Sequence, residues 1–174
     1  MSNEAIWRVN RDWWCALPKD VAAEIIRTAE QTLDNQLRVA ISADQRACAV
    51  GAAFLTVAAA LGASALALAG SDIRAGALGA GVSALMFLAA AFSAFHAARP
   101  VPFHFLGSEP KLWADDPADR PLQDALGDLA EHLQRRISCN TDVLKSNNEW
   151  FRLGVMLGIL APALGMIAGA VLLI

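Results

Sequence analysis

The chain has 174 residues, of which 56% are apolar, and its formal net charge is −3. A balance this close to neutral excludes a global basic field for nucleic acid or anionic lipid. Because its three cysteines lie far apart without metal-site spacing, and no catalytic motif occurs, we expect no metal, no other cofactor and no enzymatic activity. These cysteines are Cys15, Cys48 and Cys139.

Charged residues are confined to two long segments and one short turn. Residues 1–46 carry six Lys/Arg and seven Asp/Glu, and residues 99–152 carry seven and nine. Three stretches without Asp, Glu, Lys or Arg, residues 47–71, 75–98 and 153–174, have 25, 24 and 22 residues. Since a helix needs about 20 apolar residues to cross the hydrocarbon core, we predict three transmembrane helices in these ranges.

The N-terminal segment, residues 1–17, is rich in Trp and Arg. Its candidate ligand-binding residues are Trp7, Arg8, Arg11, Trp13 and Trp14. Aromatic faces stack on bases and interleaved Arg neutralises phosphates, so such a segment can bind a nucleotide or a short single strand. Two alternatives stay open: an aromatic anchor at the membrane surface, or a plug whose Trp side chains pack on neighbouring helices.

Residues 18–46 are predicted to form a helical stalk that continues into the first span. Pro18 suits the first position of a helix. Apolar residues then recur at helical spacing, at Ala22, Ile25, Ile26, Ala29, Leu33, Leu37, Ala40 and Ile41. No Gly or Pro separates this stripe from the span, which predicts one helix from about Pro18 to about Gly70.

The second polar segment begins with a Pro-rich loop, residues 99–120, whose four prolines exclude a regular helix. Residues 121–152 then form a second predicted stalk that leads into the third span, with an apolar stripe at Leu122, Leu126, Leu129, Leu133, Ile137, Leu144 and Phe151. Asn140 falls near this stripe, where it either fixes register and oligomeric state or faces solvent. We expect the two stripes to pack on each other or on neighbouring subunits. This favours a homo-oligomer, with a tetramer as the favoured stoichiometry.

The third span carries small residues near one face. They are Gly154, Gly158, Gly165 and Gly169, with Pro162 among them. Because helices in lipid associate through small residues that permit close approach, we assign these five to span packing or to the lining of a pore. Pro162 also predicts a kink. The lack of charge in the spans argues against an ordinary ion pump. It leaves an apolar, hydration-gated pore or a plain anchor.

Orientation follows from the positive charges. Thirteen of the fourteen Lys/Arg lie in residues 1–46 or 99–152, which two spans place on the same side, and the positive-inside rule makes that side cytoplasmic. We therefore predict an all-α membrane protein with its first and third helices extended into a cytoplasmic stalk and its C-terminus on the opposite side of the membrane. Arg135 and Arg136 on the second stalk either complete the basic ligand surface or belong to a solvated face.

Three short patterns mark the polar flanks of the spans. Residues 42–47 (Ser-Ala-Asp-Gln-Arg-Ala) open the first span, Arg-Pro-x-x-Phe and Gly-x-x-Pro-x-x-Trp follow the second, and a stalk with Asn140 leads into the third. With this layout the chain resembles the small multi-span effectors of bacterial anti-phage defence operons, among them the Pycsar transmembrane effector and the Hailong membrane effector.

The resemblance implies an oligomeric membrane effector that permeabilises or depolarises the inner membrane. It also implies control by a nucleotide signal that a partner enzyme makes. The alternative function is a non-conducting anchor that docks a soluble cytoplasmic partner through its stalks.

Overall fold

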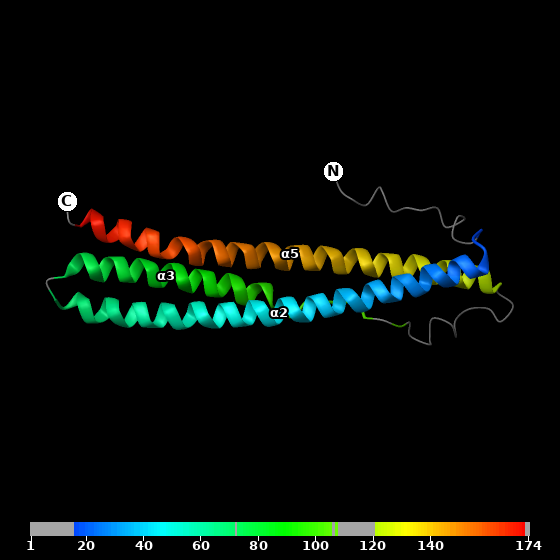
Figure 1. Ribbon diagram of the computed structural model, residues 1–174, viewed down its shortest axis with the longest axis horizontal. Coiled ribbons are helices and arrows are strands. Elements are labelled where there is room, and N and C mark those ends of the chain that lie inside the picture. The colour runs from blue at the N-terminus through cyan, green and yellow to red at the C-terminus, as the bar shows by residue number, and fades with distance from the viewer. Residues whose placement is uncertain (1–15, 72, 106, 108–120, 173–174) are drawn as a thin grey trace. The chain divides into compact units, whose positions relative to one another are not determined.

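The computed structural model describes residues 16–71, 73–105, 107 and 121–172. Three long helices make up most of them: α2 (Lys19–Ala69), α3 (Arg74–Ala97) and α5 (Leu122–Val171) (Figure 1). Each helix contains a stretch long and apolar enough to cross a membrane, and no strand occurs among the described residues. The predicted fold class, an all-α membrane protein with three transmembrane helices, is confirmed.

Proline sets the start of both long helices. The carbonyl of Pro18 accepts a hydrogen bond from the N–H of Ala22 at 2.9 Å, and the carbonyl of Pro121 accepts one from Ala125 at 3.3 Å. Each proline thus provides the first helical carbonyl, at a position where its missing N–H costs nothing. As expected, α2 runs without interruption from the stalk into the first span, and α5 continues through Pro162 as a helix.

The chain divides into two compact units. We call Met1–Val39 with Pro102–Val143 the stalk unit, and Ala40–Val101 with Leu144–Ile174 the span unit. In the stalk unit, α2 and α5 bury Ala22, Leu33, Ala130 and Leu133 against each other. This confirms that the two stripes pack together. Leu122 is 55% exposed, because a seam between two helices is narrower than the predicted stripe.

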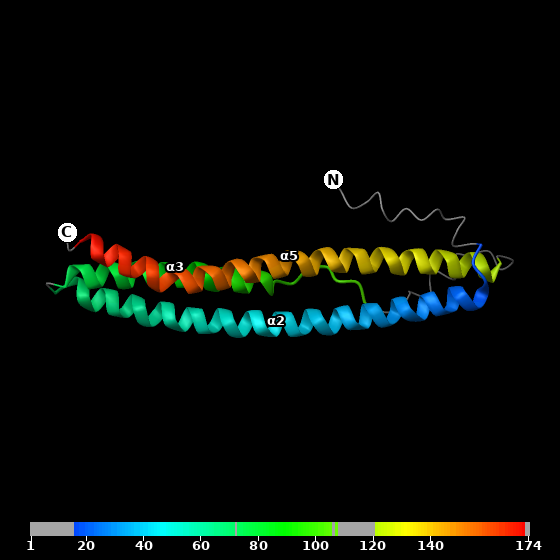
Figure 2. The ribbon, with the colours of Figure 1, turned by 45° about the horizontal axis from the view of Figure 1, so that its top comes forward.

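In the span unit, α3 lies beside both long helices (Figures 1 and 2). Ala58 of α2, Phe87 of α3 and Ala161 of α5 form its buried centre. The Phe54 and Phe87 rings meet there with their centroids 5.7 Å apart. Most of the large apolar side chains on the outer faces of this unit are exposed, as expected of helices that face acyl chains.

Candidate functional site

The most specific polar contact of the stalk unit is a clamp that Asn140 forms on the chain after α3. Asn140 is fully buried. Its Oδ1 accepts the backbone N–H of His104 at 2.9 Å, and its Nδ2 donates to the backbone carbonyl of His104 at 2.9 Å. One carboxamide thus satisfies both main-chain groups of one residue, as a neighbouring strand would. The interpretation of Asn140 as solvent-facing is wrong.

Arg136 extends this clamp by one helical turn. Its guanidinium donates to the carbonyl of Phe105 at 3.4 Å and, by a shorter bond, to the carbonyl of Gly107. Gly107 has a φ of +96°, in the left-handed region that glycine adopts without a Cβ penalty. Arg136, proposed from the sequence as a ligand contact, therefore binds the main-chain carbonyls of Phe105 and Gly107, and these neutral groups are weaker partners for a guanidinium than an anion is.

A polar layer next to the clamp joins α2 to α5 within the stalk unit. The Nε2 of Gln36 donates to the carbonyl of Ile137 at 3.1 Å and to Oγ1 of Thr141 at 3.0 Å. The Oε1 of Gln36 is buried without a hydrogen-bond partner in the described structure. These bonds fix the register of the two stalk helices one turn from Asn140.

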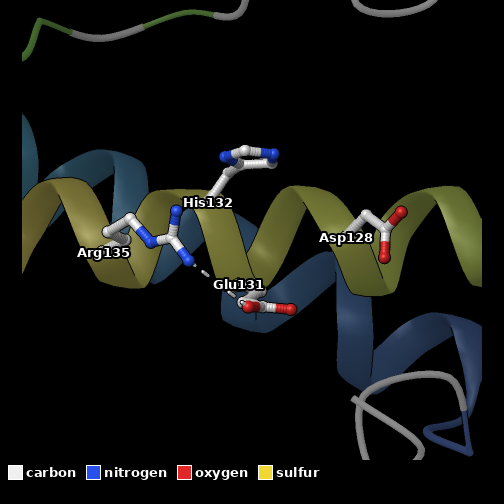
Figure 3. A pocket seen from close by; sticks show the side chains of 4 residues that line it. All are labelled: Asp128, Glu131, His132 and Arg135. Carbon is white, nitrogen blue, oxygen red and sulfur yellow. Dashed lines mark ion pairs between the residues drawn. The ribbon is translucent and has the colours of Figure 1, made fainter. Parts of the chain in front are cut away.

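Arg135 lies on a different face of α5 from the clamp. Its guanidinium is 4.0 Å from the carboxylate of Glu131, and both side chains are largely exposed. Together with Asp128 and His132 they line a hollow of about 360 Å³ (Figure 3). With two carboxylates beside one guanidinium, this surface is of mixed charge and not a basic patch. The structure thus does not bring Arg135 and Arg136 together on one contact surface.

The other predicted ligand residues, Trp7, Arg8, Arg11, Trp13 and Trp14, lie outside the described residues. Among the residues described, no group of three or more His, Cys, Asp or Glu is placed to hold a metal ion.

In the span unit, three of the predicted glycines lie against the backbone of α3. A Cβ placed on Gly154 would be 2.9 Å from the carbonyl oxygen of Ala90, and one on Gly169 would be 2.9 Å from that of Ala75. A Cβ on Gly165 would be 2.6 Å from the carbonyl oxygen of Gly79. These distances are shorter than real Cβ contacts, so α3 and α5 pack antiparallel at a separation that only glycine permits.

The remaining two predicted residues of this span have different surroundings. Gly158 faces α2, where the ring of Phe54 occupies the space that a Cβ would need. Pro162 is exposed and borders an apolar groove of about 720 Å³ that all three helices line. Ser83, at the same groove, donates a hydrogen bond to the carbonyl of Ala161 at 3.1 Å across the seam between α3 and α5.

His104, Gln36 and Phe54 are among the contributors to these contacts that were not singled out from the sequence. His104 takes part through its backbone, which no side-chain pattern reveals. Gln36 lies one turn after Leu33 on the predicted stripe, so a polar residue within an apolar periodicity was the available signal.

Comparison of the chain with protein-family models, with curated proteins and with solved structures finds no match.

Proposed function

We propose that this protein is an oligomeric effector of the bacterial inner membrane. In this proposal it forms an ion-conducting path in anti-phage defence when its cytoplasmic stalk binds a nucleotide or a short single-stranded nucleic acid from a partner enzyme. Residues 1–46 and 99–152 then lie in the cytoplasm and the C-terminus lies at the periplasmic side. The layout of charged and uncharged segments supports this orientation.

The observation that carries the proposal is the set of apolar side chains that the stalk unit leaves exposed. Val21, Val39 and Phe105 are 41%, 54% and 62% exposed, although the stalk is the polar part of the chain. Further copies of the chain would cover them, and a tetramer remains our favoured stoichiometry. Oligomerisation is also what conduction requires, because Ala58, Phe87 and Ala161 fill the centre of a single span unit. A water path would therefore form between copies.

The clamp supplies a gating mechanism. Arg136 binds two neutral carbonyls of residues 105–107, and a phosphate would be the stronger partner for its guanidinium. Ligand binding would then draw Arg136 away from this segment, which continues from the end of α3. A ligand that prefers the released state by about 100-fold contributes roughly 2.7 kcal/mol to gating.

Regulated expression in bacteria with a voltage-sensitive dye tests the proposal. The wild type should depolarise the membrane when the partner enzyme is present. The R136Q variant should depolarise it without the partner enzyme, because the segment is already released. R135Q is the matched control, since Arg135 does not bind residues 105–107. Protein present in the membrane fraction with no depolarisation in any variant would refute conduction.

A second candidate function is a non-conducting anchor whose stalk docks a soluble protein. The mixed-charge hollow of Asp128, Glu131, His132 and Arg135 favours it, because surfaces of both signs suit protein partners better than nucleic acid. In that case the membrane potential stays constant in all variants, while charge reversal at Glu131 releases the docked partner.

A further inference from the structure

One arginine flanks each uncharged stretch at the same end of the span unit. Arg46 precedes the first uncharged stretch, Arg99 follows the second, and Arg152 precedes the third. Helix contacts show that the three positions lie at a similar depth. A Cβ on Gly51 of α2 would touch the Phe95 ring of α3 at 3.0 Å.

The third helix lies at the same depth. A Cβ on Gly154 of α5 would be 3.1 Å from the backbone nitrogen of Ala94 in α3. With a rise of about 1.5 Å per residue, each arginine is within about 8 Å of these contacts along the axis.

Within the described ranges, these three arginines differ from Arg27, Arg38 and Arg135 of the stalk unit in having no acidic partner. Arg27 pairs with Glu24 and Arg38 pairs with Asp34. Among the described residues, Arg46 makes only a 3.3 Å hydrogen bond to a carbonyl of its own helix, and no ion pair involves Arg99 or Arg152. All three are exposed, so their guanidinium groups are available to an external anion.

In the part of the chain that the structure describes, no ion pair joins the nearby acids to these arginines. Glu149 lies one turn before Arg152 on α5 without forming an ion pair with it. Burial raises the pKa of Asp44, which lies two residues before Arg46.

An aromatic cluster lies beside the arginines. The rings of His96 and Trp150 have centroids 4.3 Å apart, and Phe92 stacks on His96 at 5.9 Å. Trp at the end of an apolar span is typical of the boundary between hydrocarbon and headgroups. Arg152 lies two residues after Trp150 and Arg99 lies three residues after His96, so the arginines are at the level of this boundary, where lipid phosphates lie.

We propose that Arg46, Arg99 and Arg152 form a binding site for the headgroup phosphates of anionic phospholipids. A guanidinium binds phosphate through two parallel hydrogen bonds, and the three arginines lie at a similar depth at one end of the span unit. An anionic headgroup in this position ties the helix ends together and stabilises the span unit. The site depends only on insertion in a bilayer and not on conduction or on a nucleotide signal.

Thermal unfolding of the full-length protein in a neutral detergent tests the site. The midpoint should rise with added phosphatidylglycerol and stay constant with phosphatidylcholine. A cationic side chain near an anionic surface contributes about fivefold to binding, so the triple variant R46Q/R99Q/R152Q should need about 100-fold more phosphatidylglycerol. The triple Lys variant, which keeps the charge, should lose less.

Two further variants separate lipid binding from misfolding. R38Q, an exposed arginine of α2 that Asp34 already binds, should titrate like the wild type. R99Q alone lies beyond the end of α3 and leaves the helices intact, and it should need about fivefold more lipid. The proposal is overturned if R99Q and the triple Gln variant titrate like the wild type, if phosphatidylcholine acts equally, or if inorganic phosphate at the same concentration gives the same rise.

Discussion

Replacing Asn140 is the sharpest test of the clamp. In N140A both hydrogen bonds to His104, each 2.9 Å long, are lost. At about 0.5–1.5 kcal/mol per bond, the free energy needed to detach the segment that follows α3 should fall by about 1–3 kcal/mol. The protection of the His104 amide against hydrogen exchange should then fall by about 5- to 150-fold.

The assay is hydrogen–deuterium exchange of the full-length protein in detergent, read on peptides that cover residues 100–107. The matched control is N148A, which removes an exposed amide from the same helix and should leave this segment unchanged. Unchanged exchange in N140A, or an equal increase in N148A, would refute the idea that Asn140 holds the chain.

N140D adds a pH signature to the same experiment. A carboxylate at this position would still accept the N–H of His104 but would repel its carbonyl, whereas a protonated carboxyl can donate to it. Burial raises the pKa of a carboxyl above its unfolded value of about 3.9, and the guanidinium of Arg136, which the carbonyls of Phe105 and Gly107 hold one turn away, opposes this rise only in part. The clamp of N140D should therefore be strongest in acid and weaken as the pH rises through this range, while the wild type shows no such trend.

Three further predictions concern other contacts. G165A should lower the free energy of unfolding in detergent by about 1–3 kcal/mol, because its Cβ meets the α3 backbone. The control G62A should be neutral, since a Cβ at this position has open space around it. Equal effects of the two variants would contradict the close packing of α3 and α5. E131Q should leave Arg135 without its partner and lower the free energy of unfolding by at most about 1 kcal/mol, as the loss of an exposed ion pair does. A larger loss would show that the hollow contributes to stability. The hydrogen bond from Arg27 lowers the pKa of Glu24, so the contribution of this pair should be present at neutral pH and fade as the pH falls through that lowered value; a carboxyl titration by NMR checks this, and a midpoint that does not rise in R27Q would exclude the pairing in solution.

The fold was predictable because its cause is visible in the sequence. In lipid, the backbone N–H and C=O groups of a long uncharged stretch need hydrogen-bond partners within the protein, and a helix provides them. Prolines at positions 18 and 121 mark where the long helices begin. The period of the apolar residues also placed Leu33 and Leu133 at the stalk seam.

The site was less predictable, because its specific contacts involve the main chain. Asn140 and Arg136 recognise N–H and carbonyl groups of the main chain, which all residues of the loop other than its prolines possess, so nothing in the sequence points to His104 or Gly107. Nothing in the sequence indicated that Gly158 faces α2 while Gly154 and Gly165 face α3, because the partner of a small residue depends on how three helices are placed around it.

The stalk part and the span part of α5 are stabilised by different kinds of contact. The surrounding medium, water in one case and acyl chains in the other, determines which residues form these contacts. In the stalk unit, Leu133 is buried because water drives large apolar side chains together, so its loss leaves a cavity. In the span unit, acyl chains are as apolar as leucine, and close approach of backbones is the remaining source of attraction. There the contact residues are Gly154, Gly165 and Gly169, and added volume is what disrupts them. A substitution that enlarges a side chain should therefore be tolerated less in the span seam than one that reduces it, and the reverse should hold in the stalk seam.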